Sequence, residues 1–341
     1  MTSMTVVTPS TQHLDRESAL EVLGLVLKSR ALEEGAIRWQ RQGLIPGYAP
    51  CLGQEAAQIG IGWSMGPRDR AFPTYREAGV ALALGVDMPA YMATHQGLWH
   101  GGLYDSGTTR LAPFQAVVAG SCLHAVGWAL GQRMNGEDSV AVAFLGDGAS
   151  SQGDVHEAMN FAATMGAPVV FYVQNNGWAI STPTAKQVAG GFVSERAAGY
   201  GMSAYRADGN DVEAVITASR AALDEARESQ RPVVVEVMTY RRGPHSTSDD
   251  PGRYRSLQQE YEQGAVDPVD VATQQALAAG VEQAEADRLG EEARAWVEDL
   301  REKTVNAPHR PGDEIFDFVF QEPTETLTAQ KTAWQEETDR D

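Results

Sequence analysis

The sequence predicts an α/β fold built on a parallel sheet with helices on both faces. Three short runs are dominated by apolar and β-branched residues, SVAVAFL at 139–145, VVFYV at 169–173 and RPVVVEVMTYR at 231–241. Such near-continuous apolar runs are typical of parallel strands that are buried on both faces. Between the first two runs, apolar residues recur at spacings of three and four from Val155 to Met165, which predicts a helix. A strand–helix–strand unit of this kind forms a right-handed crossover with parallel strands.

The residues that follow these two strands suggest a cation site. Gly146-Asp147-Gly148 breaks the first run, and Gln174-Asn175-Asn176-Gly177 ends the second. Parallel strands end on the same edge of a sheet, where open α/β folds bind ligands. One carboxylate, one amide oxygen and nearby backbone carbonyls suit Mg²⁺. The alternative is structural, with the aspartate capping a helix and Asn-Gly forming a turn. Finding both motifs after consecutive strands favours the cation site.

The N-terminal part of the chain contains two predicted helices. Residues 1–14 are mostly polar and rich in threonine, and we expect them to be disordered. From Asp15 to Gln42 the apolar spacing is helical, and Gly43 ends the pattern. The sequence GQEA at 53–56 opens a second, short helix.

Later in the chain, the small residues of 116–134 predict a closely packed helix. Asn210 or Asp211 is expected to cap another helix, which runs through 229. Beyond 265 the chain is acidic and helical. We therefore expect one α/β domain over 15–325 with helical extensions at both ends, followed by a charged tail over 326–341.

Composition excludes several classes of partner. A formal net charge of −19 disfavours nucleic acid and anionic membranes, whose phosphates would be repelled. No run of about 20 apolar residues could span a bilayer, and no basic-then-apolar segment at the N-terminus indicates a signal peptide. Cys51 and Cys122 have no CxxC partner, so we expect reduced thiols. These features predict a cytoplasmic protein.

At the level of whole motifs, the sequence resembles a known enzyme family. GDG is followed after 26 residues by NN, which resembles the thiamine diphosphate motif. The longer string GDGASSQGDVHEAMNFAA…PVVFYVQNNGWAISTP resembles the alpha subunit of two-component 2-oxo acid dehydrogenases. These are the thiamine-dependent decarboxylases of the branched-chain 2-oxo acid and pyruvate dehydrogenase complexes. TYREAG at 74–79 and GPHSTSDDP at 243–251 are similar to the branched-chain members, and the resemblance runs from about 15 to 323. It implies a thiamine diphosphate-binding fold.

The resemblance also implies a set of site residues. Asp147, Asn176 and the Trp178 carbonyl would bind Mg²⁺, and His245 would be catalytic, orienting or protonating intermediates. Residues in contact with thiamine diphosphate would be Tyr75, Arg76, Ala116, Val118, Gly146, Asp147, Gly148, Ala149, Gln174, Asn176, Trp178 and His245. A hydroxyl beside a planar cation, as in Tyr75-Arg76, makes a good diphosphate clamp.

In three places the sequence departs from the family pattern. Gln174 stands where branched-chain members often have arginine, so a phosphate contact there would be neutral and weaker. Some relatives bind potassium with Ser, Thr and Gln, whereas this chain has Ala116, Gly120 and Ser121, which makes that site doubtful. The loop 95–112 has no counterpart that assigns residues. Its His95 and His100 are five apart, which fits no helical pair of metal ligands.

The resemblance further implies partners. Activation of the cofactor needs a glutamate that lies on the beta subunit in this family, so we expect an inactive alpha chain alone and an active α2β2 heterotetramer. The acyl group would pass to a lipoyl group on the lipoyl domain of the transacylase component. Ser246 matches a serine that is phosphorylated in some eukaryotic relatives, but nothing in the sequence indicates a kinase.

Three competing interpretations remain. A nicotinamide-dependent dehydrogenase would show GxGxxG, whereas Gly146-x-Gly148 continues to Ser151, and no acidic residue ends the next strand. A non-catalytic scaffold subunit would keep the fold but would not need Tyr75, Arg76 and His245 together. Within the enzyme interpretation, the small 2-oxo acid substrate could be pyruvate or an acetoin-type compound. The motifs favour a branched-chain acid of the 2-oxoisovalerate type.

Overall fold

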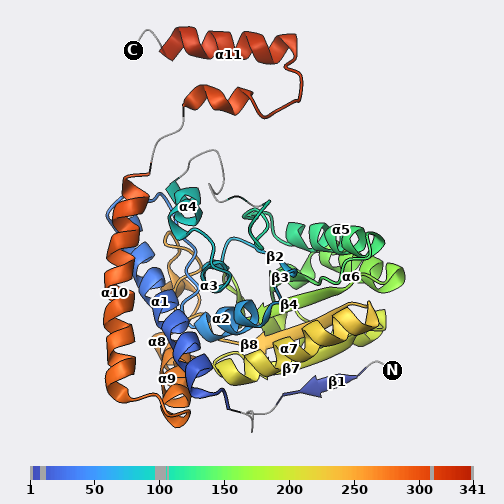
Figure 1. Ribbon diagram of the computed structural model, residues 1–341, viewed down its shortest axis with the longest axis vertical. Coiled ribbons are helices and arrows are strands. Elements are labelled where there is room, and N and C mark those ends of the chain that lie inside the picture. The colour runs from blue at the N-terminus through green and yellow to red at the C-terminus, as the bar shows by residue number, and fades with distance from the viewer. Residues whose placement is uncertain (1–2, 8–12, 97–104, 106, 308–310, 339–341) are drawn as a thin grey trace.

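The computed structural model describes the chain except residues 1–2, 8–12, 97–104, 106, 308–310 and 339–341. Its centre is a six-stranded sheet in which every neighbouring pair of strands is parallel (Figure 1). The strand order is β1 (Met4–Val6), β7 (Ser203–Asp208), β8 (Val233–Met238), β4 (Val169–Asn175), β3 (Ala141–Gly146) and β2 (Arg70–Phe72). The predicted parallel α/β sheet is therefore confirmed, and the three strands expected from the sequence lie side by side in its interior.

The other three strands were not predicted. β1 and β2 are three residues long and lie at the two edges of the sheet. β7 has the sequence SAYRAD, which is partly exposed and carries two charges. The expectation of disorder is wrong for residues 4–6, because backbone pairing with β7 holds them in the sheet. A three-residue strand with exposed side chains has no hydrophobic period to reveal it.

Helices cover both faces of the sheet, as predicted (Figure 1). On one face, α5 (Gly120–Met134) and α6 (Gly153–Met165) pack against Ala143 and Leu145 of β3. On the other face, α2 (Glu55–Ser64) and α7 (Val212–Ser229) pack against Val142 and Phe144. This alternation along a fully buried strand is why the run has no polar residue.

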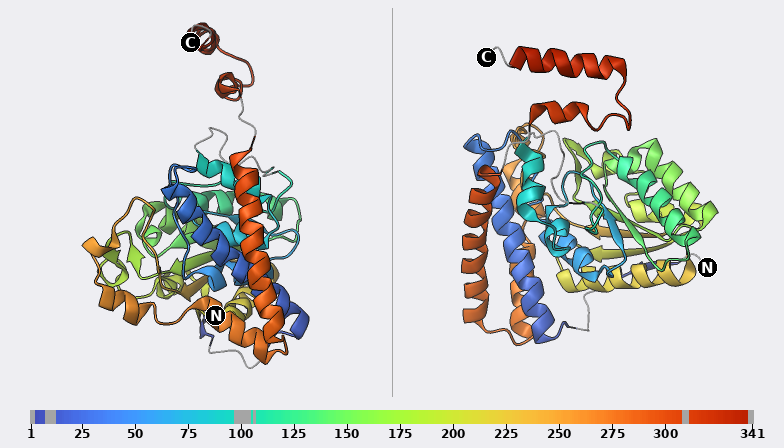
Figure 2. Two further views of the ribbon diagram at one scale, coloured as in Figure 1. Left: turned by 90° about the vertical axis from the view of Figure 1, so that its left-hand side faces the viewer. Right: turned by 45° about the horizontal axis from the view of Figure 1, so that its top comes forward.

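A second layer of helices flanks the sheet. α1 (Arg16–Arg41) packs against α10 (Gln283–Val305) and α9 (Pro268–Ala278), and the right-hand view of Figure 2 shows α1 alongside α10. Asp15 caps α1 by accepting from the Ser18 backbone N–H, and Gly43 follows its end with φ of 75°. The predicted bounds of this helix are confirmed. The shorter helices of this part are α3 (Ala78–Ala83), α4 (Met88–Ala93) and α8 (Leu257–Gln263).

Two predicted helix starts can be compared with the structure. Asp211 is the N-cap of α7 and accepts from the Ala214 backbone N–H. The helix expected over 116–134 begins four residues later, at Gly120, because Ala119 adopts a left-handed conformation with φ of 72°. Residues 116–119 are therefore a loop, and this loop reaches the functional site.

Several short elements connect the main ones. Five are 3₁₀ turns, η1 (Thr94–Gln96), η2 (Ala149–Ser151), η3 (Thr184–Lys186), η4 (Val193–Tyr200) and η5 (Pro251–Arg253). β5 (Trp178–Ala179) and β6 (Thr182–Pro183) form a small antiparallel hairpin directly after β4. Cys51 and Cys122 are buried and free of disulfides, as expected.

The C-terminal segment stands apart from the sheet (Figures 1 and 2). It consists of η6 (Gly312–Phe316) and α11 (Glu325–Thr338), which contact each other through Phe316 and Trp334 and through the Lys331–Asp317 ion pair. Most of the predicted charged tail is thus helical. No helix in the described part of the chain is long and apolar enough to cross a membrane.

Candidate active site

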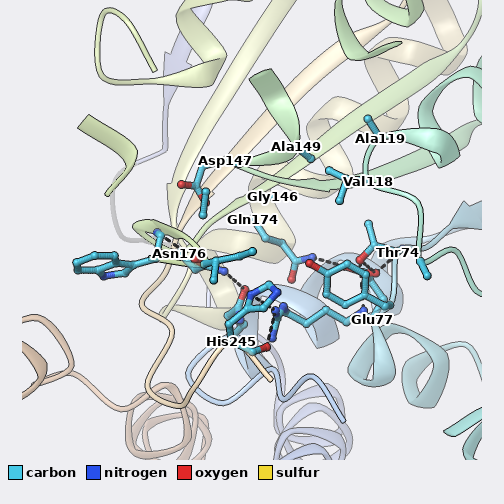
Figure 3. Close-up of a pocket in the computed structure, with 18 residues that line it drawn as sticks. Thr74, Glu77, Val118, Ala119, Gly146, Asp147, Ala149, Gln174, Asn176 and His245 are labelled. Carbon is cyan, nitrogen blue, oxygen red and sulfur yellow. Dashed lines mark hydrogen bonds between the residues drawn. The ribbon is translucent and has the colours of Figure 1, made fainter. Parts of the chain in front are cut away.

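A cavity of about 450 Å³ opens where β2, β3 and β4 end (Figure 3). Eighteen residues line it, and they include every site residue that the sequence suggested. The suggested residues are Tyr75, Arg76, Ala116, Val118, Gly146, Asp147, Gly148, Ala149, Gln174, Asn176, Trp178 and His245. Segments more than 160 residues apart in the chain, from Tyr75 to His245, therefore meet in one cavity.

Asp147 follows the end of β3 and is 1% exposed. Its Oδ2 accepts hydrogen bonds from Thr184 Oγ1 at 2.5 Å and from Gln187 Nε2 at 3.0 Å. Burial raises the pKa of this carboxyl above its usual range. Both donors are neutral, so the carboxylate charge is oriented without being neutralised by them.

Asn176 follows β4 and lies beside Asp147 in the cavity (Figure 3). Its Oδ1 accepts from the Trp178 backbone N–H at 3.2 Å, and its Nδ2 donates to Gln54 Oε1 at 3.3 Å. Gln54 is fully buried, and its own Nε2 has no hydrogen-bond partner among the described residues. A buried donor of this kind is costly unless a ligand satisfies it. The sequence indicated the segment around Gln54 only as the start of α2.

Arg76 is hydrogen-bonded to the segment that carries His245. Its Nη1 donates to the Pro50 carbonyl at 2.5 Å. Its Nη2 donates to the His245 carbonyl at 3.0 Å and lies 3.1 Å from His245 Nδ1. Since a guanidinium can only donate, Nδ1 must accept, and the ring proton is on Nε2. Burial, with the charges of Arg76 and Arg241, lowers the pKa of His245 to about 4, so the imidazole is neutral near pH 7.

Hydrogen bonds from neighbouring residues hold the loop around His245 in place. Asp249 accepts from the His245 backbone N–H at 2.8 Å and from the Tyr254 hydroxyl at 2.5 Å. The guanidinium of Arg241 is buried and donates to the Ile180 carbonyl and to Tyr254. These contacts connect the His245 loop to the hairpin that follows β4, so the two walls of the cavity are held together.

Gln174 has different partners from those expected. Its side chain donates to Glu77 Oε1 at 2.8 Å and accepts from Gln58 Nε2 at 3.1 Å. Glu77 also accepts from Thr74, and burial raises the pKa of its carboxyl. The amide of Gln174 is thus engaged by side chains in the wall of the cavity.

Sequence reasoning missed six lining residues, Gln54, Thr74, Glu77, Ala119, Ala179 and Ile180. Thr74 and Glu77 flank Tyr75-Arg76, so their proximity to the proposed clamp was a usable signal. Gln54, Ala119, Ala179 and Ile180 reach the cavity through tertiary packing and carried no comparable signal.

Gly148 is required by close packing. A Cβ at this position would lie 2.6 Å from the Ala179 side chain, so the hairpin after β4 leaves no room for one. The backbone of 146–149 can therefore line the cavity directly, as a diphosphate cradle requires.

Other metal sites are not supported. The described residues contain no group of three or more His, Cys, Asp and Glu side chains that could hold a metal ion. His95 is buried and packs against the Tyr48 and Phe114 rings, while His100 lies outside the described residues. At the doubtful potassium position, Ser121 Oγ donates to the Phe144 carbonyl at 3.3 Å.

Comparison with known proteins decides the family. A family model described as "Dehydrogenase E1 component" matches residues 24–311. The chain belongs to this family. The chain is therefore an oxidoreductase that acts on oxo groups, the alpha subunit of a 2-oxo acid dehydrogenase E1 component, and members of the family use thiamine diphosphate. The resemblance found in the motifs is confirmed.

Similar relatives support the subunit assignment. The chain is 41% identical over 324 residues to the 3-methyl-2-oxobutanoate dehydrogenase subunit alpha of Mycobacterium tuberculosis (strain CDC 1551 / Oshkosh), covering 94% of this chain and 87% of that relative. It is 35% identical over 257 residues to a pyruvate dehydrogenase E1 component subunit alpha of Staphylococcus aureus (strain Mu50 / ATCC 700699), covering 75% and 69%. A subunit of that name from Acholeplasma laidlawii is 33% identical over 320 residues, covering 93% and 92%.

Proposed function

We propose that this alpha subunit binds thiamine diphosphate with Mg²⁺ in the cavity and decarboxylates a branched-chain 2-oxo acid of the 2-oxoisovalerate type together with a beta subunit. The acyl group would then pass to the lipoyl group of a transacylase. One observation carries the proposal: every residue that the family motif assigns to the cofactor lines the same cavity.

The cavity fits a diphosphate with a divalent cation. Asp147 is a buried carboxylate bonded by neutral donors, Asn176 supplies an amide oxygen, and the Trp178 carbonyl is the proposed third protein ligand. The Nε2 of Gln54, which has no hydrogen-bond partner in the described part of the chain, offers a donor to a ligand oxygen. The backbone of Gly146 to Ala149 would wrap the diphosphate, and Ala116 and Val118 would contact the aminopyrimidine ring.

When bound, thiamine diphosphate supplies a nucleophilic carbon and an electron sink for decarboxylation. The protein's part is to bind, orient and move protons. Tyr75 and Arg76 would orient the diphosphate end. His245 is neutral and carries its proton on Nε2, so it can donate a hydrogen bond or a proton to a reacting oxygen or sulfur.

A partner subunit completes the proposed site. The cofactor needs an activating glutamate on its ring nitrogen, and the described residues form a single α/β sheet without a second half that could supply it. We infer an α2β2 heterotetramer with shared sites, inactive as the alpha chain alone. The C-terminal segment supports a partner because Ile315, Val319 and Phe320 are 39%, 50% and 55% exposed.

The substrate assignment rests on motifs and similarity. TYREAG and STSDDP are of the branched-chain type, and the Mycobacterium tuberculosis relative is a 3-methyl-2-oxobutanoate dehydrogenase by name. The alternative is pyruvate, which the names of the other two relatives favour. An acetoin-type substrate has no relative among these to support it.

Reconstitution with the beta subunit tests the proposal. We expect faster decarboxylation of 3-methyl-2-oxobutanoate than of pyruvate in the presence of thiamine diphosphate and Mg²⁺. A preference for pyruvate would reverse the substrate assignment. Calorimetric titration with cofactor and Mg²⁺ separates an enzyme from a scaffold subunit, because a scaffold would show no binding. Full activity of the isolated alpha chain would contradict the shared site.

A further inference from the structure

Two side chains that no cofactor motif contains hold the carboxylate of Asp147. They come from the segment after the β5–β6 hairpin, where η3 begins. Thr184 Oγ1 and Gln187 Nε2 both donate to the same oxygen, Oδ2, at 2.5 and 3.0 Å. Neither uses Oδ1. Two donors on one oxygen fix the rotation of the carboxylate group.

The segment that provides these donors is itself anchored to the sheet. The Thr184 backbone N–H donates to the Gly177 carbonyl at 3.0 Å, and the Gly177 backbone N–H donates to Asn175 Oδ1 at 3.2 Å. Asn175 Nδ2 donates to Glu236 Oε1 at 2.9 Å. Asp147, at the end of β3, is thereby linked to a residue of β8.

Glu236, the last residue in this series of hydrogen bonds, is itself held in place by several donors. It is fully buried in β8 and accepts three further hydrogen bonds, from the Val193 backbone N–H and from the backbone N–H and hydroxyl of Ser194. A buried carboxylate with its acceptors satisfied is expected to hold its neighbours in a single arrangement. The orientation of Thr184 is therefore set by the core of the sheet and not by the surface hairpin alone.

Thr184 and Gln187 can orient the carboxylate of Asp147 without neutralising its charge. A hydroxyl and an amide carry no net charge, so they fix the carboxylate without cancelling its charge. An arginine or lysine in their place would form an ion pair with Asp147 and compete with a cation. Outer-shell donors of this kind to ligating groups change metal affinity by about 10- to 100-fold.

We propose that Thr184 and Gln187 are positioning residues that hold the Asp147 carboxylate ready for a divalent cation. The inference rests on the proposed function and deepens it. It assigns a role to a segment, 184–187, that lies outside the GDG…NN motif and does not line the cavity.

Cation affinity tests the inference directly. In the complex of alpha and beta subunits with thiamine diphosphate, Mn²⁺ binding would be measured by the loss of the electron paramagnetic resonance signal of free Mn²⁺. We expect Thr184→Val to raise the Kd for Mn²⁺ by about 10- to 100-fold and Gln187→Met by a smaller factor. Thr184→Ser keeps the hydroxyl and should restore affinity to near the wild-type value. Thr182→Val, two residues before Thr184 in β6 and exposed, is the matched control and should leave the Kd unchanged.

Each other outcome has a defined meaning. An unchanged Kd in both Thr184→Val and Gln187→Met would overturn the inference. It would equally be overturned if Thr182→Val weakened Mn²⁺ binding as much, or if Thr184→Ser failed to restore it, because the hairpin would then act through general stability. Should Thr184→Val not assemble, Gln187→Met decides. A wild-type complex that binds neither Mn²⁺ nor cofactor would instead refute the proposed function itself.

Discussion

Two buried aspartates lie at opposite ends of the sheet and are treated differently. Asp69 precedes β2 at the amino edge, and Asp147 follows β3 at the carboxyl edge; each is 1% exposed. Asp69 accepts from the backbone N–H groups of Gly66 and Val140, and Arg227 Nη2 lies 2.8 Å from both of its oxygens. Asp147 has two neutral side-chain donors and, among the described residues, no ion pair.

The two aspartates differ in how their buried charge is balanced. Burying a carboxylate is costly unless a cation compensates it. At the amino edge Arg227 of α7 forms an ion pair with Asp69 and so compensates its charge. At the carboxyl edge two neutral donors orient the carboxylate of Asp147, and burial raises the pKa of this carboxyl. A buried carboxylate with neutral side-chain donors at the ligand-binding edge of a sheet supports the cation site that we propose.

We expect the largest effect from removing the carboxylate of Asp147. Asp147→Ala should abolish binding of Mg²⁺ and thiamine diphosphate, because the proposed cation ligand is lost. Its thermal unfolding should remain cooperative, since the substitution removes a buried charge. Calorimetric titration measures the binding of Mg²⁺ and cofactor, and a thermal melt measures the cooperativity of unfolding. Normal cofactor binding by this variant would refute the metal assignment.

The amino-edge counterpart should show the reverse pattern. Asp69→Asn leaves Arg227 without its partner and should lower the free energy of unfolding by about 3 kcal/mol. Cofactor affinity should change little, because the site is at the other end of the sheet. Denaturant unfolding and calorimetry on the same sample check both expectations. A loss of affinity as large as that of Asp147→Ala would remove the distinction between the two edges.

Substitution of His245 tests whether a residue of the same cavity acts in acyl transfer and not in cofactor binding. His245→Ala should retain cofactor binding and slow transfer of the acyl group by about 100-fold, because a positioned proton donor contributes roughly that much. Single-turnover measurement of decarboxylation and of lipoyl acylation separates the two steps. Loss of cofactor binding in this variant would instead make His245 a binding residue.

The smallest expected effect is a pH dependence of stability. The pKa of His245 is lowered to about 4 in the folded protein, against an ordinary value near 6.5. Between these values the unfolded chain holds the proton and the folded chain does not, so the stabilisation is present above about pH 6.5 and is lost as the pH falls.

A matched variant isolates this contribution. Glu33 titrates in the opposite sense over part of the range, since burial raises its pKa to about 7. The stability of wild type should therefore be compared with that of His245→Asn, which keeps an acceptor for Arg76 and does not titrate. The wild type should lose stability relative to the variant from pH 6.5 to pH 4. A constant difference would mean that His245 is not held neutral.

A strand could be predicted from the sequence where both of its faces are buried. The strands β3, β4 and β8 are buried on both faces, so their apolar runs were visible, and the crossover rule then placed Asp147 beside Asn176. The edge strands β1 and β2 and the partly exposed β7 had no such pattern. The start of α5 was misplaced because a left-handed Ala119 is not a residue type that announces a helix boundary.

The parallel core of the sheet and the motif residues that line the cavity could be predicted from the sequence. This was possible because strand burial and motif spacing are local properties. Only the tertiary structure shows that Gln54 Nε2 has no partner among the described residues, that Gln174 donates to Glu77, and that Thr184 and Gln187 donate to Asp147. The three hydrogen-bonded pairs join residues 37 to 97 positions apart, and only the packed sheet brings them within hydrogen-bonding distance.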